Sequence, residues 1–243
     1  MNSSPYRKGR DRYQRQKRLL GKANQETLGN SSAAIIGAGG LGSPAATYLA
    51  MAGIGRLVLV DHDQVAPSNL NRQFLHQEKD LDRPKPISAR EKLKALNPDT
   101  AVETFEGKLT SDNLENLPDV DLLIGSVDNF ETRYLLNQQA VNRNIPYIHG
   151  AVEGFSGQLT TIVPGNTPRL RCIFPKAPPD KTGIQIMGTT AGVVGTMMAN
   201  EAIKYLTNHG SLATGELLLI DIACNNFDRL EVQKSPDCPV CGN

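Results

Sequence analysis

The chain has 243 residues, with 26 basic and 25 acidic side chains and a formal net charge of +1. This balance predicts no broad field that would attract nucleic acid or a membrane surface, so partners must be predicted from local sites. No apolar run approaches the roughly 18 residues that span a bilayer, and the polar start lacks the apolar core of a signal peptide. We therefore expect a cytoplasmic protein and, at this length, one α/β domain over residues 1–243.

The first 29 residues are predicted to form a basic N-terminal arm. Residues 2–18 are charged and poor in apolar groups, which favours a solvated segment. A helical pattern nevertheless begins around Arg12 and runs past Leu28. A solvated arm and a helix both remain open from the pattern alone.

The central motif of the chain lies between Ala33 and Asp61. An apolar run, a Gly-x-Gly-x-x-Gly turn, a helical pattern to Ala52 and a second apolar run predict a strand, a turn, a helix and a parallel strand. The motif glycines suit a tight turn, close approach of a phosphate and packing of helix on strand, and free amides at the helix start favour an anion. Asp61 closes the second run, where a carboxylate accepts hydrogen bonds from ribose hydroxyls. The motif, whose glycines are Gly37, Gly39 and Gly42, therefore predicts a nucleotide site.

Strand and helix patterns alternate from there to residue 149. A polar loop at 61–73 follows the second strand, at the end of a sheet where ligands of α/β proteins gather. Such alternation predicts a Rossmann-like, doubly wound and mostly parallel sheet. Helices are expected at residues 86–96, 111–117 and 130–142, and strands at 101–105, 120–127 and 146–149.

The last third of the chain differs from the preceding part in residue composition and pattern. Residues 157–163 predict a strand that could run antiparallel, and 164–188 form a long segment rich in proline and glycine, which is typical of a functional loop. A helical pattern returns at 189–206. Residues 217–220 and 230–232 then predict a closing hairpin, which gives the sheet antiparallel strands at its C-terminal end.

Two basic residues bear on which nucleotide binds. A dinucleotide has no terminal triphosphate, whereas an attacked α-phosphate with a departing pyrophosphate needs its charge neutralised. Arg72, in the loop beyond Asp61, and Lys85, just before a helix, are placed to face the glycine turn. Either one alone could be a surface salt bridge or a solvated helix start. Together with the glycines they favour a reacting triphosphate over a redox cofactor.

Asp128 is the candidate for a metal ligand. It follows a buried apolar strand, where its carboxylate could hold the magnesium that accompanies ATP, an ion that usually takes one or two protein carboxylates. Asp128 with Glu131 three residues later also matches a helix capping box. Both interpretations stay open at this point.

Several spaced motifs together resemble one family. The motifs are RYQRQ at 12–16, GAGGLGSP at 37–44, DHD at 61–63, SNLNRQ at 68–73, PK at 84–85, DN at 128–129 and a CxxCG tail at 238–242. With them the chain resembles, from Arg12 to Gly242, the MoeB/ThiF/HesA group of enzymes that activate ubiquitin-like sulfur-carrier proteins. The agreement of several spaced motifs is more specific than a match to one.

The resemblance implies a role for each matching position. The amides around Gly40 would cradle phosphate, Asp61 would bind the ATP ribose, and Asp128 would position Mg²⁺. Arg15 would reach from the partner subunit of a homodimer into the ATP site. The catalytic set would be Arg15, Arg72, Lys85 and Asp128, and the ATP-binding set Gly37, Gly39, Gly40, Gly42, Asp61, Asn69, Arg72, Gln73, Lys85, Asp128 and Asn129.

The implied activity is ATP-dependent adenylylation of the C-terminal glycine of a small ubiquitin-fold carrier that ends in Gly-Gly. The carrier's terminal carboxylate would attack the α-phosphate and give an acyl-adenylate and pyrophosphate, while the protein positions the reactants and screens charge. The pathway would be molybdopterin or thiamin biosynthesis or a related sulfur transfer. The carrier tail is expected to lie under residues 164–188.

The cysteines depart from the family pattern. Members with a structural zinc bring together two Cys-x-x-Cys pairs. Here Cys238 and Cys241 form the second pair, whereas in the first pair Arg169 occupies the position of the first cysteine and Cys172 is the second. A guanidinium cannot replace a thiolate in a tetrahedral zinc site. Zinc held by the three remaining thiols and a metal-free or thiol-active tail both stay open. Cys224 is predicted to be a buried strand residue.

A second departure concerns the loop at 180–186, where many relatives carry a cysteine for a covalent step and this chain has none. The resemblance then implies an adenylyltransferase that depends on a separate sulfur donor, such as a cysteine desulfurase or a rhodanese-like protein. The histidines, at 62, 76, 149 and 209, show no paired spacing and are expected to be satisfied loop or strand-end residues.

Other functions remain compatible with the same motifs. An enzyme of this fold could adenylylate a different peptide or a small-molecule carboxylate. A regulatory member could hold ATP without turnover, and a nicotinamide-dependent oxidoreductase would use the same glycine turn. Competition between ATP and nicotinamide compounds would separate the last possibility from the others.

Overall fold

The computed structural model describes residues 11–178, 183 and 185–240. Its helices are α1 (Gln14–Leu20), α2 (Lys22–Asn30), α3 (Gly42–Ala52), α4 (Lys85–Leu96), α5 (Phe130–Arg143), α6 (Leu170–Ile173) and α7 (Gly188–Thr207). Its strands are β1 (Ser32–Ile36), β2 (Arg56–Asp61), β3 (Ala101–Glu106), β4 (Leu122–Gly125), β5 (Tyr147–Glu153), β6 (Ser156–Ile162), β7 (Glu216–Asp221) and β8 (Asn226–Glu231).

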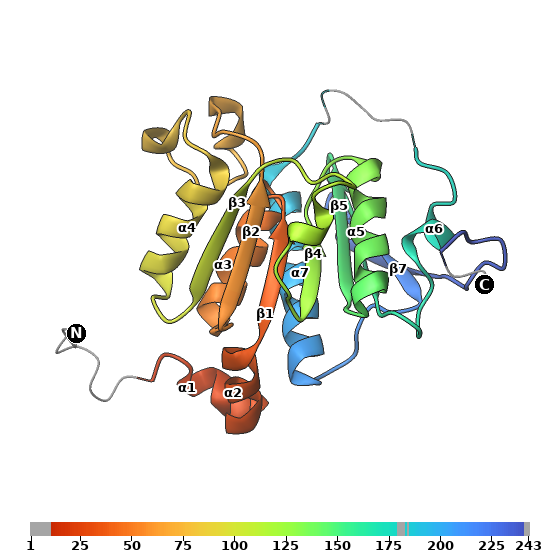
Figure 1. The fold of residues 1–243 in the computed structure, drawn as a ribbon, viewed down its shortest axis with the longest axis horizontal. Coiled ribbons are helices and arrows are strands. Elements are labelled where there is room, and N and C mark those ends of the chain that lie inside the picture. The colour runs from red at the N-terminus through yellow and green to blue at the C-terminus, as the bar shows by residue number, and fades with distance from the viewer. Residues whose placement is uncertain (1–10, 179–182, 184, 241–243) are drawn as a thin grey trace.

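The strands form one eight-stranded sheet in the order β3-β2-β1-β4-β5-β6-β7-β8. Neighbours from β3 to β5 are parallel, and β5 to β8 pair antiparallel. This confirms the predicted mostly parallel, doubly wound sheet with antiparallel strands at its C-terminal end. The chain moves from β1 outward to β2 and β3, then returns to β4 on the other side of β1 (Figure 1). The carboxyl ends of β1 and β4 therefore flank the topological switch point, where ligands of such sheets bind.

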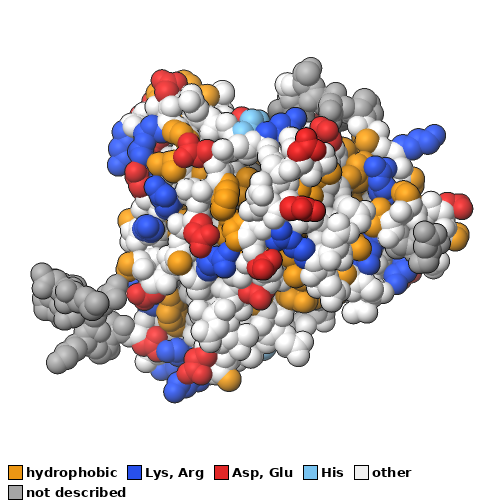
Figure 2. All heavy atoms as spheres, viewed as in Figure 1, with side chains coloured by type: hydrophobic (Ala, Val, Ile, Leu, Met, Phe, Trp, Pro, Cys, Tyr) orange, Lys and Arg blue, Asp and Glu red, His pale blue; other side chains and the backbone are white. Residues whose placement is uncertain are grey.

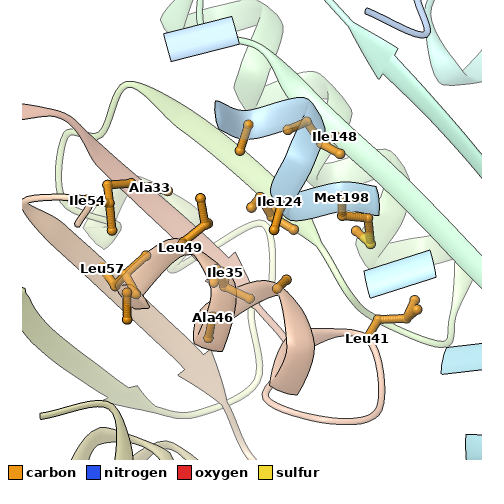
Figure 3. Close-up of a cluster of buried hydrophobic side chains, with 14 of the residues drawn as sticks. Ala33, Ile35, Leu41, Ala46, Leu49, Ile54, Leu57, Ile124, Ile148 and Met198 are labelled. Atoms are coloured by element: carbon orange, nitrogen blue, oxygen red, sulfur yellow. The ribbon is translucent and has the colours of Figure 1, made fainter. Parts of the chain in front are cut away.

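Two hydrophobic cores lie on opposite faces of the sheet. Strand β1 contributes to both, because Ala33 and Ile35 pack with α3, α4 and α7 on one face while Ala34 and Ile36 pack with α5 on the other. Figure 3 shows part of the first core, in which Leu49 of α3 lies beside Ile35 of β1, and Met198 of α7 belongs to the same cluster. Burial on both faces explains why the central strands are continuous apolar runs rather than alternating ones.

The N-terminal arm is helical from Gln14 onward. The predicted helical pattern is broken once, at Gly21, whose φ of +85° ends α1 and lets α2 start in a new direction. Both helices lie at the lower edge of the sheet in Figure 1. Residues 1–10 lie outside the described part of the chain.

Three predicted elements need correction. The helix expected at 111–117 is only the short 3₁₀ turn Leu114–Asn116, because Asn113 caps its own loop by accepting from the Thr110 N–H at 2.9 Å. The strand expected at 230–232 is β8, which begins at Asn226. The loop at 164–188 contains the short helix α6, and its residues 179–182 and 184 are outside the described residues.

Cys224 is a further correction. It was expected in a buried strand, and it lies exposed in the turn between β7 and β8. Asp221 Oδ1 accepts hydrogen bonds from the N–H groups of Ala223 and Cys224, and Asn225 has a φ of +55°. Both are features of an Asx-type turn, which outcompetes strand extension at this point.

The surface mixes both signs of charge. On the face shown in Figure 2, Lys and Arg side chains are interspersed with Asp and Glu, as the near-neutral formal charge suggests. No helix in the described part of the chain has the length and apolarity that crossing a membrane requires.

Candidate functional site

The glycine turn follows β1 at the switch point of the sheet. Gly37 has a φ of +100°, and a Cβ there would lie 2.5 Å from the carbonyl oxygen of Ser126, which follows β4. A Cβ on Gly42 would overlap the Gly37 carbonyl oxygen, so the first turn of α3 packs directly on the glycine turn. Only glycine fits at both positions, which is the packing reason for the motif.

A cavity of about 430 Å³ opens at the glycine turn, outside the carboxyl ends of β1, β2 and β4. It is lined by ten of the predicted ATP-binding residues. These are Gly37, Gly39, Gly40, Asp61, Asn69, Arg72, Gln73, Lys85, Asp128 and Asn129. Gly42 does not line it and instead supports the turn from below. The structure thus brings the predicted set together, and the role of each member stays a prediction.

Asp61 fastens the glycine turn as well as facing the cavity. Its Oδ2 accepts from the Ala38 N–H at 2.7 Å, and its Oδ1 accepts from the Asp63 N–H at 2.9 Å. Carboxylate oxygens each have a second lone pair, so a ribose hydroxyl can still donate to the same group. The sequence motif predicted the ribose contact but not this tie to the turn.

Lys85 is the most buried cation of the cavity. It is 5% exposed at the start of α4, and its Nζ donates to Asp63 Oδ2 at 2.7 Å. The Lys85 N–H also donates to the Asp63 carbonyl oxygen at 3.0 Å, which fixes the helix start to the loop after β2. Asp61, His62 and Asp63 form a group with converging ligand atoms, but the carboxylate of Asp63 is already paired with the lysine.

Arg72 and Gln73 form the wall that faces the glycines. Arg72 Nη1 donates to the Ser68 carbonyl oxygen at 2.8 Å, and its side-chain carbons lie 3.5 Å from a Cβ built on Gly40. Gln73 is buried, and its Oε1 has no hydrogen-bond partner among the described residues. The Ser126 Oγ, also on the cavity wall, is unpaired in the same sense. Two orphaned polar atoms beside a phosphate-type turn fit a polar ligand such as ATP.

Asp128 is available for a ligand. The N-cap of α5 is Asn129, whose Oδ1 accepts from the Thr132 N–H at 2.9 Å, so the capping-box interpretation of Asp128 is wrong. Asp128 itself is exposed at the cavity and receives one long hydrogen bond, 3.4 Å from Asn129 Nδ2. An exposed carboxylate beside a triphosphate site is a suitable ligand for Mg²⁺.

A second cavity of about 510 Å³ adjoins the first. Asp128, Arg133 and Val152 line both. The walls of the second cavity are mainly apolar, and Phe174 and Pro178 come from the segment predicted as the substrate loop. Arg133 donates to the Val127 carbonyl oxygen at 2.9 Å and stacks over Phe130, which holds the shared wall in place.

Arg15 lies at the opposite edge of its own protomer. Helix α1 is fastened to the last residues of α3 and α4, through Gln16 Nε2 to the Ala52 carbonyl oxygen and Arg12 Nη1 to the Leu96 carbonyl oxygen, both at 2.9 Å. Helices α3 and α4 begin near the glycine turn and end at the amino edge of the sheet (Figure 1). Arg15 is exposed there and does not line the cavity of its own protomer.

The three cysteines that the structure describes, Cys172, Cys224 and Cys238, do not converge on a metal site. Cys238 is buried, Cys172 is partly exposed, and Cys241 lies outside the described residues. Among the described residues one group of three converging metal ligands exists, and no cysteine belongs to it. Arg169, at the position of a missing thiolate, is 6% exposed, and its Nε and Nη1 have no acceptor in the described chain. The zinc site therefore stays a prediction that rests on Cys241.

Two histidines are buried, which spacing did not predict. His149 on β5 is fully buried, and its Nδ1 has no partner among the described residues, so it is not the satisfied histidine expected. Desolvation holds the pKa of His149 well below its usual value, and the nearby positive charge of Arg133 acts in the same direction. His76 contacts the glycine turn itself.

The chain is similar to known proteins in sequence and in fold. The ThiF family profile matches residues 13–240. The chain is 42% identical to a SAMP-activating enzyme E1 of Haloferax volcanii, over 96% of this chain and 88% of that protein. It is also 42% identical to a sulfur carrier protein adenylyltransferase of Thermus thermophilus, over 96% and 91% of the two chains. The crystal structure of E. coli MccB with ATP has the same fold, with a TM-score of 0.86, 24% identity and coverage of 97% of this chain and 75% of that one.

Proposed function

Because this chain belongs to the ThiF family, we propose that it adenylylates the C-terminal glycine of a small ubiquitin-like sulfur-carrier protein, with ATP as co-substrate. The relatives named as an activating enzyme and as a sulfur carrier protein adenylyltransferase support this assignment. The observation that carries it is the arrangement of Arg72 and Lys85 opposite the glycine turn in one cavity. Two cations beyond the helix start suit a triphosphate that must release pyrophosphate.

The reaction needs positioning rather than a proton acceptor. The carrier's terminal carboxylate is already ionised, and one of its oxygens forms a bond to the α-phosphorus. The bond between the α-phosphorus and the bridging oxygen breaks, and pyrophosphate leaves with the electron pair. Lys85 and Arg72 would compensate the charge that develops on the phosphate oxygens, and the amides of the glycine turn would hold the chain of phosphates in line.

Mg²⁺, when bound with ATP, would neutralise part of the charge on the phosphates. Asp128 is the residue that we assign to it, since its carboxylate is exposed at the cavity and is not used as a helix cap. Zinc in the tail would be structural, and no step of the reaction depends on it.

The second cavity is the proposed site for the carrier's C-terminal tail. It is mainly apolar, it adjoins the ATP cavity, and Asp128 lies on the wall that the two cavities share. A flexible tail entering between β5, β6 and residues 174–178 would bring its terminal carboxylate to the α-phosphate. Segment 164–188 would cover that tail, as the sequence predicted.

The active form is proposed to be a homodimer, because Arg15 is at the wrong edge of the sheet to act in its own protomer. Mixing two inactive variants, Arg15→Ala and Lys85→Ala, would create dimers in which one site receives an intact arginine and an intact lysine. Recovery of up to about a quarter of wild-type activity, from the statistics of random mixing, is expected. Two variants that stay inactive after exchange of subunits would contradict the role of Arg15.

Carrier-dependent exchange of labelled pyrophosphate into ATP tests the function. We expect exchange with a carrier that ends in Gly-Gly and none with the same carrier lacking the last glycine. Exchange with an unrelated peptide or a small carboxylate, but with no sulfur carrier, would favour the alternative acceptor. ATP binding without exchange on any acceptor would favour a regulatory member of the family. Since the chain lacks a thiol at 180–186, the acyl-adenylate would pass to a separate sulfur donor.

A further inference from the structure

His76 joins the glycine turn to helix α4. It is 3% exposed, its Nε2 lies 3.0 Å from the Ala38 carbonyl oxygen, and its Nδ1 lies 2.9 Å from Ser88 Oγ. Ala38 is the residue between the first two motif glycines. His76 does not line the ATP cavity but lies behind its wall. Its backbone N–H donates to the carbonyl oxygen of Gln73, which does line the cavity.

The hydrogen-bond partners decide which nitrogen carries the proton. A carbonyl oxygen can only accept, so Nε2 of His76 must donate to Ala38. The neutral ring then accepts at Nδ1 from the Ser88 hydroxyl. Ser88 Oγ in turn accepts from Lys92 Nζ at 2.9 Å, and Lys92 is ion-paired with the fully buried Asp80. This chain of partners leaves one tautomer and one ring orientation.

The backbone of Ala38 is held at both of its polar groups, and its carbonyl belongs to the Ala38–Gly39 peptide. The Ala38 N–H donates to Asp61, and the Ala38 carbonyl accepts from His76. In a planar trans peptide the carbonyl and the following N–H point in opposite directions. A carbonyl directed back at His76 therefore directs the Gly39 N–H away from it, and Gly39 lines the ATP cavity.

We propose that His76 is a positioning residue that fixes the Ala38–Gly39 peptide so that the Gly39 N–H is presented to the ATP phosphates. The inference rests on the proposed function only in requiring that ATP binds at the glycine turn. A free peptide would have to be ordered by each incoming nucleotide, and pre-organisation removes that cost.

The charge state of the ring agrees with this role. Burial lowers the pKa of His76, and Lys85 and Lys92 lower it further, while the Ala38 carbonyl and Asp61 act in the opposite direction. The net shift is downward, so the imidazole is neutral at physiological pH. Only the neutral ring can accept from Ser88 while donating to Ala38.

Nucleotide binding to two variants tests the proposal. His76→Leu removes the donor and keeps the volume, whereas His76→Gln retains an N–H donor at the position of Nε2. We expect His76→Leu to weaken ATP and ADP binding about tenfold, the scale of one hydrogen bond, and to leave adenosine binding unchanged because adenosine has no phosphate. His76→Gln should restore most of the ATP affinity. Leu93→Ala is the control for lost stability, because Leu93 is buried in α4 and lies away from the glycine turn; this variant should bind ATP normally.

Two results would overturn the proposal. One is a folded His76→Leu protein that binds ATP as tightly as the wild type. The other is an equal loss for ATP and adenosine, which would mean a general collapse of the site. If His76→Leu does not fold, the ¹⁵N shifts of the His76 ring in the wild type decide: the Nε2–H tautomer is expected, and an Nδ1–H tautomer would refute the proposal. This last measurement needs no nucleotide, so it stands even if the proposed function fails.

Discussion

Replacing Lys85 with methionine should separate catalysis from stability. The side chain is 5% exposed, and methionine matches its unbranched stem, so the packing at the start of α4 is retained. The lost ion pair joins Lys85 to an Asp63 whose side chain is 51% exposed. A half-exposed pair contributes at most about 1 kcal/mol, and water can solvate the remaining carboxylate. For a domain of this size that corresponds to a fall in Tm of roughly 2–4 °C.

The catalytic loss should be far larger. A fixed cation beside the phosphate oxygens stabilises the charge that develops as pyrophosphate leaves, and removal of such a group lowers kcat about 100- to 1,000-fold. The assay is carrier-dependent pyrophosphate exchange, with Tm measured on the same samples. Lys94→Met is the matched control, because Lys94 is exposed on the same helix and the charge change is identical.

The reasoning would be refuted by exchange rates within about twofold of the wild type. It would also be refuted if Tm fell by more than about 10 °C, since the ion pair would then be structural and the loss of activity would follow from unfolding. Lys94→Met should leave both quantities unchanged.

Three further predictions concern the turn, the histidines and the tail. Gly42→Ala should lower the free energy of unfolding by about 1–3 kcal/mol and weaken ATP binding, since its Cβ would overlap the Gly37 carbonyl. The control Gly192→Ala has open space around its Cβ and should have neither effect, so equal behaviour of the two variants would contradict the packing argument. Burial lowers the pKa values of His76 and His149 in the folded state, so below about pH 6.5 the unfolded chain binds more protons than the folded chain. The free energy of unfolding should therefore be at its full value above that pH and should fall as the pH drops below it, by at most about 1.4 kcal/mol per pH unit for each histidine. Urea unfolding at several pH values measures this, and a free energy of unfolding that does not change with pH would contradict it. Metal analysis of the purified wild type and of Cys238→Ser tests the tail: zinc lost on substitution supports the thiolate site, and equal zinc in both excludes Cys238 as a ligand.

The sequence predicted the sheet, and ten of the predicted ATP-binding residues line one cavity, for physical reasons that the structure makes plain. Gly37 and Gly42 could be recognised because only glycine tolerates their contacts, and the apolar run of β1 because both of its faces are buried. Arg72 and Lys85 could be predicted as neighbours because parallel strands deliver their loops to one edge of the sheet.

The predictions that failed did so because local hydrogen bonds compete with helix or strand formation, or because the partners of a residue lie far away along the chain. The segment 111–117 is too short for helical periodicity to outweigh the loop cap made by Asn113. The turn at Cys224 could have been predicted from Asp221 and Asn225, because both residue types favour turns. A prediction based on the pattern of apolar residues alone does not take them into account. His76 could not be found from spacing, because its partners are 38 and 12 residues away along the chain.

The position of the label in ATP tests the central claim most directly. In a single turnover with the cognate Gly-Gly carrier, the account predicts that ³²P at the α-position becomes attached to the carrier and is released as AMP by hydroxylamine, while ³²P at the γ-position leaves in pyrophosphate. Transfer of the γ-label to the carrier, or no nucleotide chemistry together with tight binding of a nicotinamide dinucleotide, would contradict it.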